Sequence, residues 1–147
     1  MARVSVLKHI EGRVPRGLVS RAVEAALKAE GAADKDLEVT VVFVSDEEMR
    51  QLCLKFRGED RITDVLSFPA EVEGALGDVV ICLPQAKRQA KEAGWSTSKE
   101  VALLAIHGTL HLLGHEDKTE EGRRKMREKE REALSLLGIR PEEGGLV

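Results

Sequence analysis

Two histidines lie one helical turn apart in the stretch HGTLHLLGHEDK, which begins at residue 107. His107 and His111 are four residues apart, and residues with this spacing lie on the same face of an α-helix. The rest of the segment up to Gly114 is nearly all apolar, and a polar group buried there without a partner would cost roughly 1–3 kcal/mol. Two ring nitrogens on one face can bind a single metal ion, so the spacing predicts a metal site.

Three further polar side chains follow the glycine directly: His115, Glu116 and Asp117. Zinc takes histidine nitrogen, thiolate and carboxylate ligands; three protein ligands plus water make a catalytic site, and four make a closed structural one. The layout resembles the zinc peptidase pattern HExxHxxGxxH/D. Position 108, however, is a glycine, so the general base of the peptidases is missing from its place. The alternative interpretation is a pair of core histidines, each satisfied by a hydrogen bond.

The same segment closely resembles the metal motif HGxLHLxGYDH of the YbeY family of bacterial rRNA-maturation endoribonucleases. ITDVLSFP and LGDVVIC are similar to that family's two other signature segments, in the same order, and LCLKFRGED resembles the stretch before the first. The resemblance covers about residues 40–125. It implies a metal-dependent, single-strand-specific endoribonuclease that acts in rRNA processing, ribosome maturation and quality control.

The resemblance also implies a set of metal ligands. In ungapped register, Asp117 stands where the family has its third histidine, and His115 stands where it has a tyrosine. His107, His111 and Asp117 are therefore the expected ligands, with His115 as the alternative third ligand. We expect one divalent ion, zinc by preference, and no other cofactor. A carboxylate ligand would shift the preference somewhat towards oxygen-loving ions.

Outside the histidine helix, the resemblance implies a functional arginine at Arg57. A guanidinium can bind phosphate through two parallel hydrogen bonds, so the expected catalytic residues are Arg57, His107 and His111. Asp64 and Asp78 each precede an apolar strand. The resemblance implies that they orient loops or ligand histidines as hydrogen-bond acceptors. The alternative is that they cap local turns.

Two basic clusters and one tryptophan are candidates for contact with RNA. The clusters are Lys87, Arg88 and Lys91 on one predicted helix, and Arg123, Arg124, Lys125 and Arg127 on another. Glutamates interleave the second cluster, which favours ion pairs within the helix over contacts with phosphate. Trp95 is expected to cover an edge of the core rather than to stack on bases.

Nine elements are needed to position these residues. Hydrophobic periodicity and capping signals predict strands at 3–10, 37–45, 63–69 and 77–83, and helices at 17–30, 45–56, 84–93, 97–114 and 119–137. Thr97 and Glu100 are predicted to form a capping box at the start of the fourth helix. That helix is apolar nearly all round, which places it in the middle of the domain.

The order of elements predicts an α+β fold. We expect one domain spanning 1–147, with a small mixed sheet and about five helices, and with the metal-binding histidines on the central apolar helix. Within that helix, we expect the side chains of Val101, Leu104, Ala105 and Leu112 to be buried. The two cysteines, Cys53 and Cys82, form no disulfide framework and are interpreted as small core residues.

Composition sets limits on the function. The 147 residues carry a formal net charge of -3, which argues against a protein that coats nucleic acid by bulk charge. No apolar run approaches ~18 residues and no apolar signal segment opens the chain. We therefore expect a cytoplasmic protein with no membrane contact.

Because net charge supplies little affinity, substrate selection is expected to depend on partners. The resemblance implies single-stranded RNA or rRNA, the small ribosomal subunit with one of its proteins, and a ribosome-assembly GTPase. Two other functions stay open. A metal-dependent hydrolase of peptides or esters needs an acid near the motif, and Glu116 is the only candidate. A non-catalytic ribosome-assembly factor with a structural metal would be favoured by a fourth protein ligand such as His115.

Overall fold

The computed structural model describes residues 2–141, which form four strands and five helices in the predicted order. The strands are β1 (Arg3–Lys8), β2 (Glu38–Val44), β3 (Val65–Pro69) and β4 (Ala75–Cys82). The helices are α1 (Arg16–Ala29), α2 (Asp46–Arg57), α3 (Leu83–Ala93), α4 (Thr97–Leu112) and α5 (Glu120–Leu136). The predicted ends differ from these by at most two residues.

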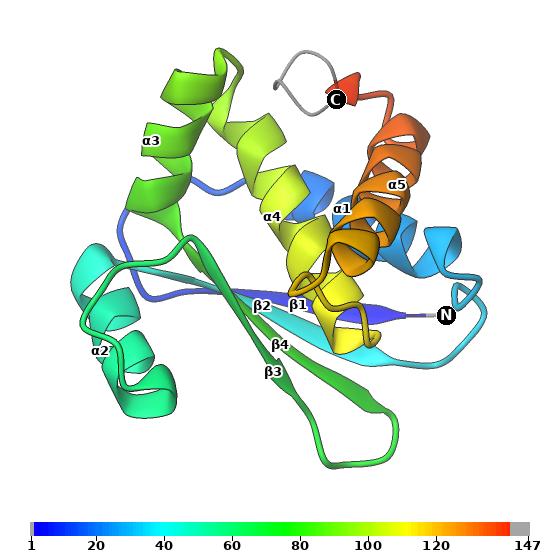
Figure 1. The fold of residues 1–147 in the computed structure, drawn as a ribbon, viewed down its shortest axis with the longest axis horizontal. Helices are drawn as coiled ribbons and strands as arrows, with labels where there is room; N and C mark the ends of the chain where they lie inside the picture. Colours follow the sequence, from blue (N-terminus) through cyan, green and yellow to red (C-terminus); the bar gives the residue numbers. More distant parts are fainter. Residues whose placement is uncertain (1, 142–147) are drawn as a thin grey trace.

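The sheet is mixed, with the strand order β1-β2-β4-β3. β1 and β4 both run parallel to β2, whereas β3 runs antiparallel to β4 at the edge. Parallel neighbours require a crossover, and the chain supplies α1 between β1 and β2, and α2 on the way from β2 to β4. The prediction of a small mixed sheet packed with five helices is confirmed (Figure 1).

The two faces of the sheet have cores of different size. The larger core lies between the sheet and α1, α4 and α5, and includes the strand residues Val41, Phe43 and Val79. The smaller core lies under α2, where Met49 and Cys53 pack against the alternate residues of the strands. Alternate strand residues point to opposite faces, so each strand contributes to both cores.

α4 is the centre of the larger core. It packs against α1, α3 and α5 as well as against β3 and β4, and Figure 1 shows it crossing the middle of the molecule. The exposed fractions of the four side chains predicted to be buried are 0% for Val101, 4% for Leu104, 0% for Ala105 and 9% for Leu112. The prediction of a central apolar helix is confirmed.

The start of α4 differs from its prediction by one residue. Ser96, not Thr97, is the N-cap, and its hydroxyl accepts a hydrogen bond from the backbone N–H of Lys99. Glu100 does not reach back to the cap. It is buried and accepts a hydrogen bond of 2.9 Å from the indole N–H of Trp95, which fixes that side chain at the edge of the core as expected.

Glycines allow α4 to lie directly on β4. A Cβ atom added to Gly108 would lie 2.5 Å from Cγ1 of Val79, and one added to Gly77 would lie 2.8 Å from Cδ2 of Leu112. Gly77 also has a φ of +148°, which disfavours any other residue. The hydroxyl of Ser67 donates a hydrogen bond of 2.8 Å to the carbonyl of Gly108. These contacts set how closely the helix that carries His107 and His111 approaches the sheet.

Both cysteines are buried, as predicted, Cys53 under α2 and Cys82 at the end of β4. Among residues 2–141, no helix is both long enough and apolar enough to span a bilayer.

Candidate metal centre and its cleft

The last two turns of α4 bring the paired histidines together. Nε2 of His107 and Nε2 of His111 are 3.1 Å apart, and about a quarter of each side chain is exposed. Gly114 follows the helix with a φ of +103°, and the N–H of His115 then donates to the carbonyl of Leu110. This turn reverses the chain and returns it along the helix end towards the two rings.

Asp117 reaches the two rings from the loop after α4. Its Oδ2 lies 3.6 Å from Nε2 of His111 and 3.8 Å from Nε2 of His107. One ligand atom from each of these three residues lies within 4.8 Å of the others. The structure therefore brings together the three residues expected as ligands.

His115, the alternative third ligand, points elsewhere. Its Nε2 lies 2.8 Å from Oε1 of Glu30, the residue that ends α1. The ammonium of Lys129 lies 3.8 Å from the same carboxylate oxygen and donates a hydrogen bond of 2.9 Å to the carbonyl of Ala29. His115 thus ties the loop to α1, in a network that also includes α5.

Hydrogen bonds on the far side of each ring fix the tautomers of the pair. Nδ1–H of His107 donates to Oε1 of Glu130 at 2.8 Å, and Nδ1–H of His111 donates to the carbonyl of His115 at 2.9 Å. A neutral imidazole carries only one proton, so each Nε2 is left with a lone pair directed into the site. This is the arrangement of a metal-ligating histidine held by an outer acceptor.

The donor set fits a divalent cation. Two lone pairs 3.1 Å apart, together with the carboxylate of Asp117, repel one another unless a proton or a cation lies among them. A tetrahedral zinc ion with bonds of roughly 2.0–2.2 Å would hold its ligand atoms about 3.3–3.6 Å apart. The distances between the ligand atoms of His107, His111 and Asp117 are close to this range.

The two histidines have pKa values displaced in opposite directions. Burial favours the neutral form of His107, but the hydrogen bond and negative charge of Glu130, with smaller contributions from Asp64 and Asp117, raise its pKa above the usual value. Burial lowers the pKa of His111, and the positive charge on His107 lowers it further. Without metal, the pair therefore holds its first proton on His107, and a metal ion would compete with that proton.

Glu130 was not identified from the sequence as part of the site. It is one of the glutamates that interleave the basic cluster of α5, for which ion pairs within the helix are the expectation, yet only 7% of it is exposed. It lies four residues after Met126 and four before Leu134, both of which are buried on the inward face of α5. An acidic residue in the apolar stripe of an amphipathic helix was the signal that could have revealed it.

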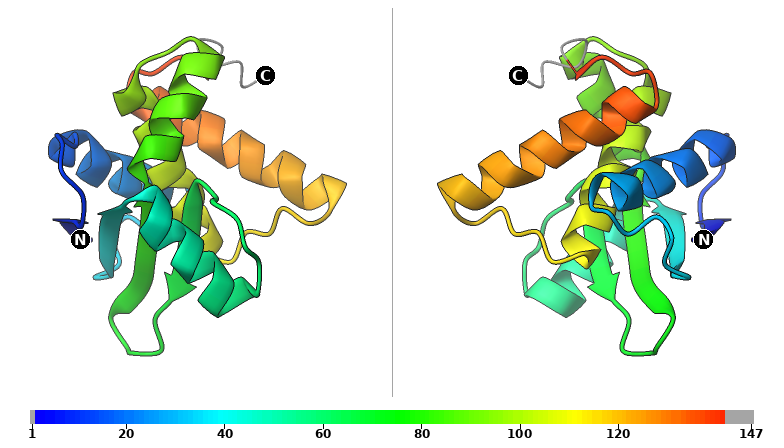
Figure 2. Two further views of the ribbon diagram at one scale, coloured as in Figure 1. Left: turned by 90° about the vertical axis from the view of Figure 1, so that its left-hand side faces the viewer. Right: turned by 90° about the vertical axis from the view of Figure 1, so that its right-hand side faces the viewer.

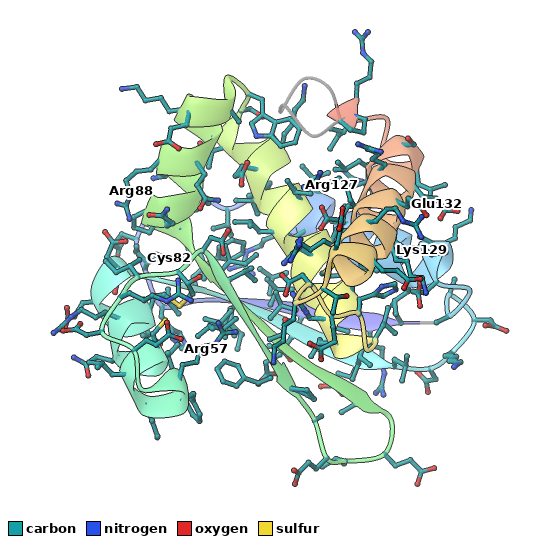
Figure 3. The ribbon with its side chains drawn as sticks, in the orientation of Figure 1. Arg57, Cys82, Arg88, Arg127, Lys129 and Glu132 are labelled. Carbon is teal, nitrogen blue, oxygen red and sulfur yellow. The ribbon has the colours of Figure 1, made fainter. Side chains whose placement is uncertain are left out.

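A cleft of about 720 Å³ opens beside the three residues. Its walls include Arg57, Asp64, Glu116 and Lys118. Arg57 is the last residue of α2, and Gly58 ends the helix in the left-handed conformation. Figure 3 labels Arg57 beside that helix. Within the described part of the chain, no hydrogen bond or ion pair engages its guanidinium. Arg57 and the histidines therefore face a common space.

The two aspartates that the resemblance implies as partners of the histidines differ, because Asp64 lies at the site and Asp78 does not. Asp64 lies in the cleft wall, but it accepts a hydrogen bond of 3.2 Å from Gln89 rather than from a ligand histidine. Asp78 is exposed and pairs with Phe68, on the face of β4 that is directed towards α2. The hypothesis that Asp78 orients the site is wrong, because α4 lies on the opposite face of the sheet.

The α5 cluster is partly paired within its helix, as the sequence favoured, and one residue of the α3 cluster is paired with α2. On α5, Arg124 contacts Glu128 at 2.9 Å and Lys125 contacts Glu121 at 3.4 Å. On α3, the guanidinium of Arg88 donates two hydrogen bonds, of 2.8 and 3.1 Å, to Asp46.

The sequence and the structure were compared with known proteins, and the matches extend over most of the chain. The sequence model of the family described as endoribonuclease YbeY matches residues 8–138. The chain is 47% identical over 132 residues to an endoribonuclease YbeY of Desulforamulus reducens, covering 83% of this chain and 86% of that one. It is 43% identical over 148 residues to one of Pelotomaculum thermopropionicum, covering 91% and 97%. A solution structure of a Thermotoga maritima protein superposes with a TM-score of 0.63 at 30% identity, covering 92% of each chain.

Proposed function

Since the chain belongs to the endoribonuclease YbeY family, we propose that it is a metal-dependent, single-strand-specific endoribonuclease of rRNA processing, ribosome maturation and quality control. The observation that carries this proposal is the convergence of His107, His111 and Asp117 in a cleft that Arg57 also lines. Single-stranded RNA, and ribosomal RNA in particular, is the proposed substrate.

Nε2 of His107, Nε2 of His111 and a carboxylate oxygen of Asp117 would hold the ion, and zinc is the ion that we propose. When bound, the ion would polarise the phosphodiester and lower the pKa of water beside it. Glu130 and the carbonyl of His115 keep both imidazoles in the tautomer that this requires. Three protein ligands beside an open cleft support a catalytic site rather than a closed one.

Arg57 is the proposed catalytic partner of the histidines. Its guanidinium can donate two parallel hydrogen bonds to phosphate oxygens, and it has no competing partner among residues 2–141. Fixed positive charge at the place where negative charge develops on the phosphate lowers the barrier to strand scission. Arg57 is the last residue of α2, so a different element from the one that carries the histidines positions its guanidinium.

The packing of Gly108 argues against a zinc peptidase activity. In the zinc peptidases, the general base occupies the position after the first histidine. Here that position faces the sheet, and even a Cβ atom would lie 2.5 Å from Val79. A glutamate could not be accommodated there without displacing α4. Glu116, the acid that the sequence offers beside the motif for a hydrolase of peptides or esters, is exposed in the wall of the cleft.

The contacts of His115 speak against a structural metal. A closed site would need a fourth protein ligand, and His115 is the histidine nearest in sequence to Asp117. Its ring is held instead by Glu30. An assembly factor with a structural metal is thus the less favoured function.

We further propose that the protein acts in the cytoplasm together with the small ribosomal subunit, one of its proteins and a ribosome-assembly GTPase. The formal net charge of -3 supports a role for partners, because a chain of this charge gains little affinity for RNA from its overall field.

The decisive experiment compares zinc-loaded, chelator-stripped and zinc-restored protein on one single-stranded RNA and on its duplex. Cleavage of the single strand should require metal and return with zinc, whereas the duplex should be cleaved far more slowly. Equal cleavage by the stripped protein would contradict the proposal. Restoration with manganese or magnesium but not with zinc would overturn the choice of ion alone.

A further inference from the structure

The outer side of α5 carries three arginines at helical spacing. Arg123, Arg127 and Arg131 are four residues apart, so they lie along one face with a rise of about 6 Å between successive members. We call these three residues the arginine row. Arg123 and Arg127 are exposed, and Arg131 is partly exposed. In the right-hand view of Figure 2, α5 lies in front of α4, on the outside of the molecule.

The arginine row is continuous with the metal centre. All three of its members line a surface hollow of about 360 Å³. A second hollow, of about 240 Å³, shares Arg123 and Arg127 with the first and has His107 and Asp117 in its wall. His107 and Asp117 also line the larger cleft that contains Arg57. The metal centre thus shares one hollow with Arg57 and another with the arginine row. Figure 3 labels Arg57 beside α2 and Arg127 on α5.

Among residues 2–141, the guanidinium groups of the row form no ion pairs, although Glu120 and Glu128 line the same hollow and Glu128 contacts Arg124. Within the described residues, no carboxylate lies within ion-pair distance of Arg127 or Arg131, and Arg123 donates only to the backbone carbonyl of Asp117, at 3.3 Å. This differs from Arg124 and Lys125 on the same helix, both of which pair with glutamates one turn away. The row is therefore a locally positive surface on a protein whose formal net charge is -3.

We propose that the arginine row binds successive phosphates of the single-stranded RNA that enters the metal site. This inference rests on the proposed function. A strand that lies across the centre would be held by the row on one side and by Arg57 on the other. Guanidinium groups can bind phosphates without reading the bases, and contacts of this kind fix the register of a strand. The row would therefore set which phosphate lies at the metal.

A folded acidic protein is the other class of polyanion that could dock on this surface. The geometry favours a strand. The row is only three residues long, it follows one helix face, and it ends in a hollow whose wall contains His107 and Asp117. A chain of phosphates can follow such a path into the cleft, whereas a folded surface cannot.

The test uses the zinc-loaded protein with two matched double variants. Arg127→Ala/Arg131→Ala removes two charges one turn apart from the row. Lys87→Ala/Lys91→Ala removes two exposed charges one turn apart from α3, away from the site. Single-turnover cleavage of a single-stranded RNA at increasing protein concentration gives the half-saturating concentration and the maximal rate. Both are measured at several salt concentrations.

In the row variant, the half-saturating protein concentration should rise about tenfold or more at 0.1 M salt. The slope of the logarithm of that concentration against the logarithm of the salt concentration should fall by about 1.4, which is 0.7 for each lost phosphate contact. The maximal rate should change far less, because neither arginine is proposed to touch the reacting phosphate. Arg127→Lys/Arg131→Lys should restore most of the salt dependence. The α3 variant should behave as the unmodified protein, and melting temperature and zinc content should be unchanged in all three.

Two results would overturn the inference while leaving the proposed function intact. The first is that the row variant and the α3 variant cleave the RNA with the same half-saturating concentration and the same salt dependence. The other is unchanged RNA affinity with lost binding of a polyglutamate peptide, which would assign the row to an acidic protein. If the unmodified, zinc-loaded protein neither binds nor cleaves the RNA, the proposed function fails and the inference fails with it.

Discussion

The two faces of the sheet each hold a polar cluster, and the clusters differ in whether their hydrogen bonds are complete. On the α2 side, Asp46 accepts two hydrogen bonds from Arg88 and one of 3.2 Å from the thiol of Cys82. On the α4 side, His107 and His111 each have one nitrogen satisfied and the other directed at a second unprotonated nitrogen. The first cluster satisfies its own hydrogen bonds, whereas the second presents two ring-nitrogen lone pairs and the carboxylate of Asp117 to a cation.

The pKa values also differ between the Asp46 cluster and the histidine pair. The hydrogen bond from Arg88 lowers the pKa of Asp46, and burial raises the pKa of Cys82 to about 12. Both residues therefore keep one protonation state at neutral pH. In the histidine pair the pKa of His107 is raised and that of His111 is lowered, so a proton that the pair binds lies on His107 and competes with a metal ion. A polar cluster with unsatisfied donor atoms indicates a ligand-binding site more reliably than a cluster that only contains many polar groups.

The largest effect should come from removing a histidine. His107→Ala should lose most of the bound metal in protein as purified, because it removes one of three donors, and cleavage should be abolished with it. Elemental analysis of the purified variant measures the first effect and a single-turnover assay the second. Full metal occupancy in His107→Ala would contradict the difference between the two clusters, because the histidine cluster would then not depend on a metal ion bound by His107.

The next effect concerns Arg57. Arg57→Ala should lower the cleavage rate by about 10²–10³-fold, as removal of a donor to a developing negative charge does in other enzymes. Arg57→Lys should recover little, because a point charge cannot donate two parallel hydrogen bonds. Metal content and melting temperature should stay constant, since Arg57 is exposed at the end of α2. A wild-type rate in Arg57→Ala would refute its role.

The third prediction separates the two candidates for the third ligand. Asp117→Ala should weaken zinc binding by about a hundredfold or more, beyond the range of 10–100-fold that is typical of an outer partner. His115→Ala should weaken it by less, because its ring contacts Glu30 and only its backbone carbonyl contacts His111. Titration of both metal-free variants with zinc compares them. The opposite order would mean that the loop rearranges when the ion binds.

Glu130 should matter less than a ligand and more than an ordinary buried residue. Glu130→Gln keeps the size of the side chain but removes the charge that favours the donor tautomer of His107. Zinc affinity should fall by about 10–100-fold, with little change in melting temperature of the metal-free protein. Glu128→Gln, an exposed neighbour on α5, is the control. Equal affinities for the two variants would remove Glu130 from the site.

The smallest effect belongs to the complete cluster. Asp46→Asn should lower the free energy of unfolding at pH 7 by about 0.2–1 kcal/mol, because the ion pair with Arg88 is partly exposed. The folded pKa of Asp46 is lowered, so the difference should be fully present above pH 4 and shrink as the pH falls below it. Denaturant unfolding at two pH values measures this. A loss of cleavage in Asp46→Asn would contradict the comparison.

The parts of the site that depend on local spacing were predictable from the sequence. His107 and His111 share a helix face wherever α4 lies, and Asp117 follows a glycine turn that the sequence marks. The partners that depend on packing were not predictable in the same way. Glu130 reaches His107 only because α5 packs on α4 with that face inward. Of the two roles left open for Asp78, the sequence could not eliminate the one in the site, because alternation along β4 defines two faces but does not say which one α4 covers.

The hydrogen bonds around His115 have a consequence for the stability of the whole chain. Its ring contacts Glu30 at the end of α1, its carbonyl holds His111 on α4, and Lys129 of α5 joins the same carboxylate. An ion held as proposed would therefore couple helices from both ends of the chain. Free metal at a hundred times its dissociation constant would stabilise the folded state by about 2.7 kcal/mol. The amount of folded protein in a cell would then follow the supply of the metal.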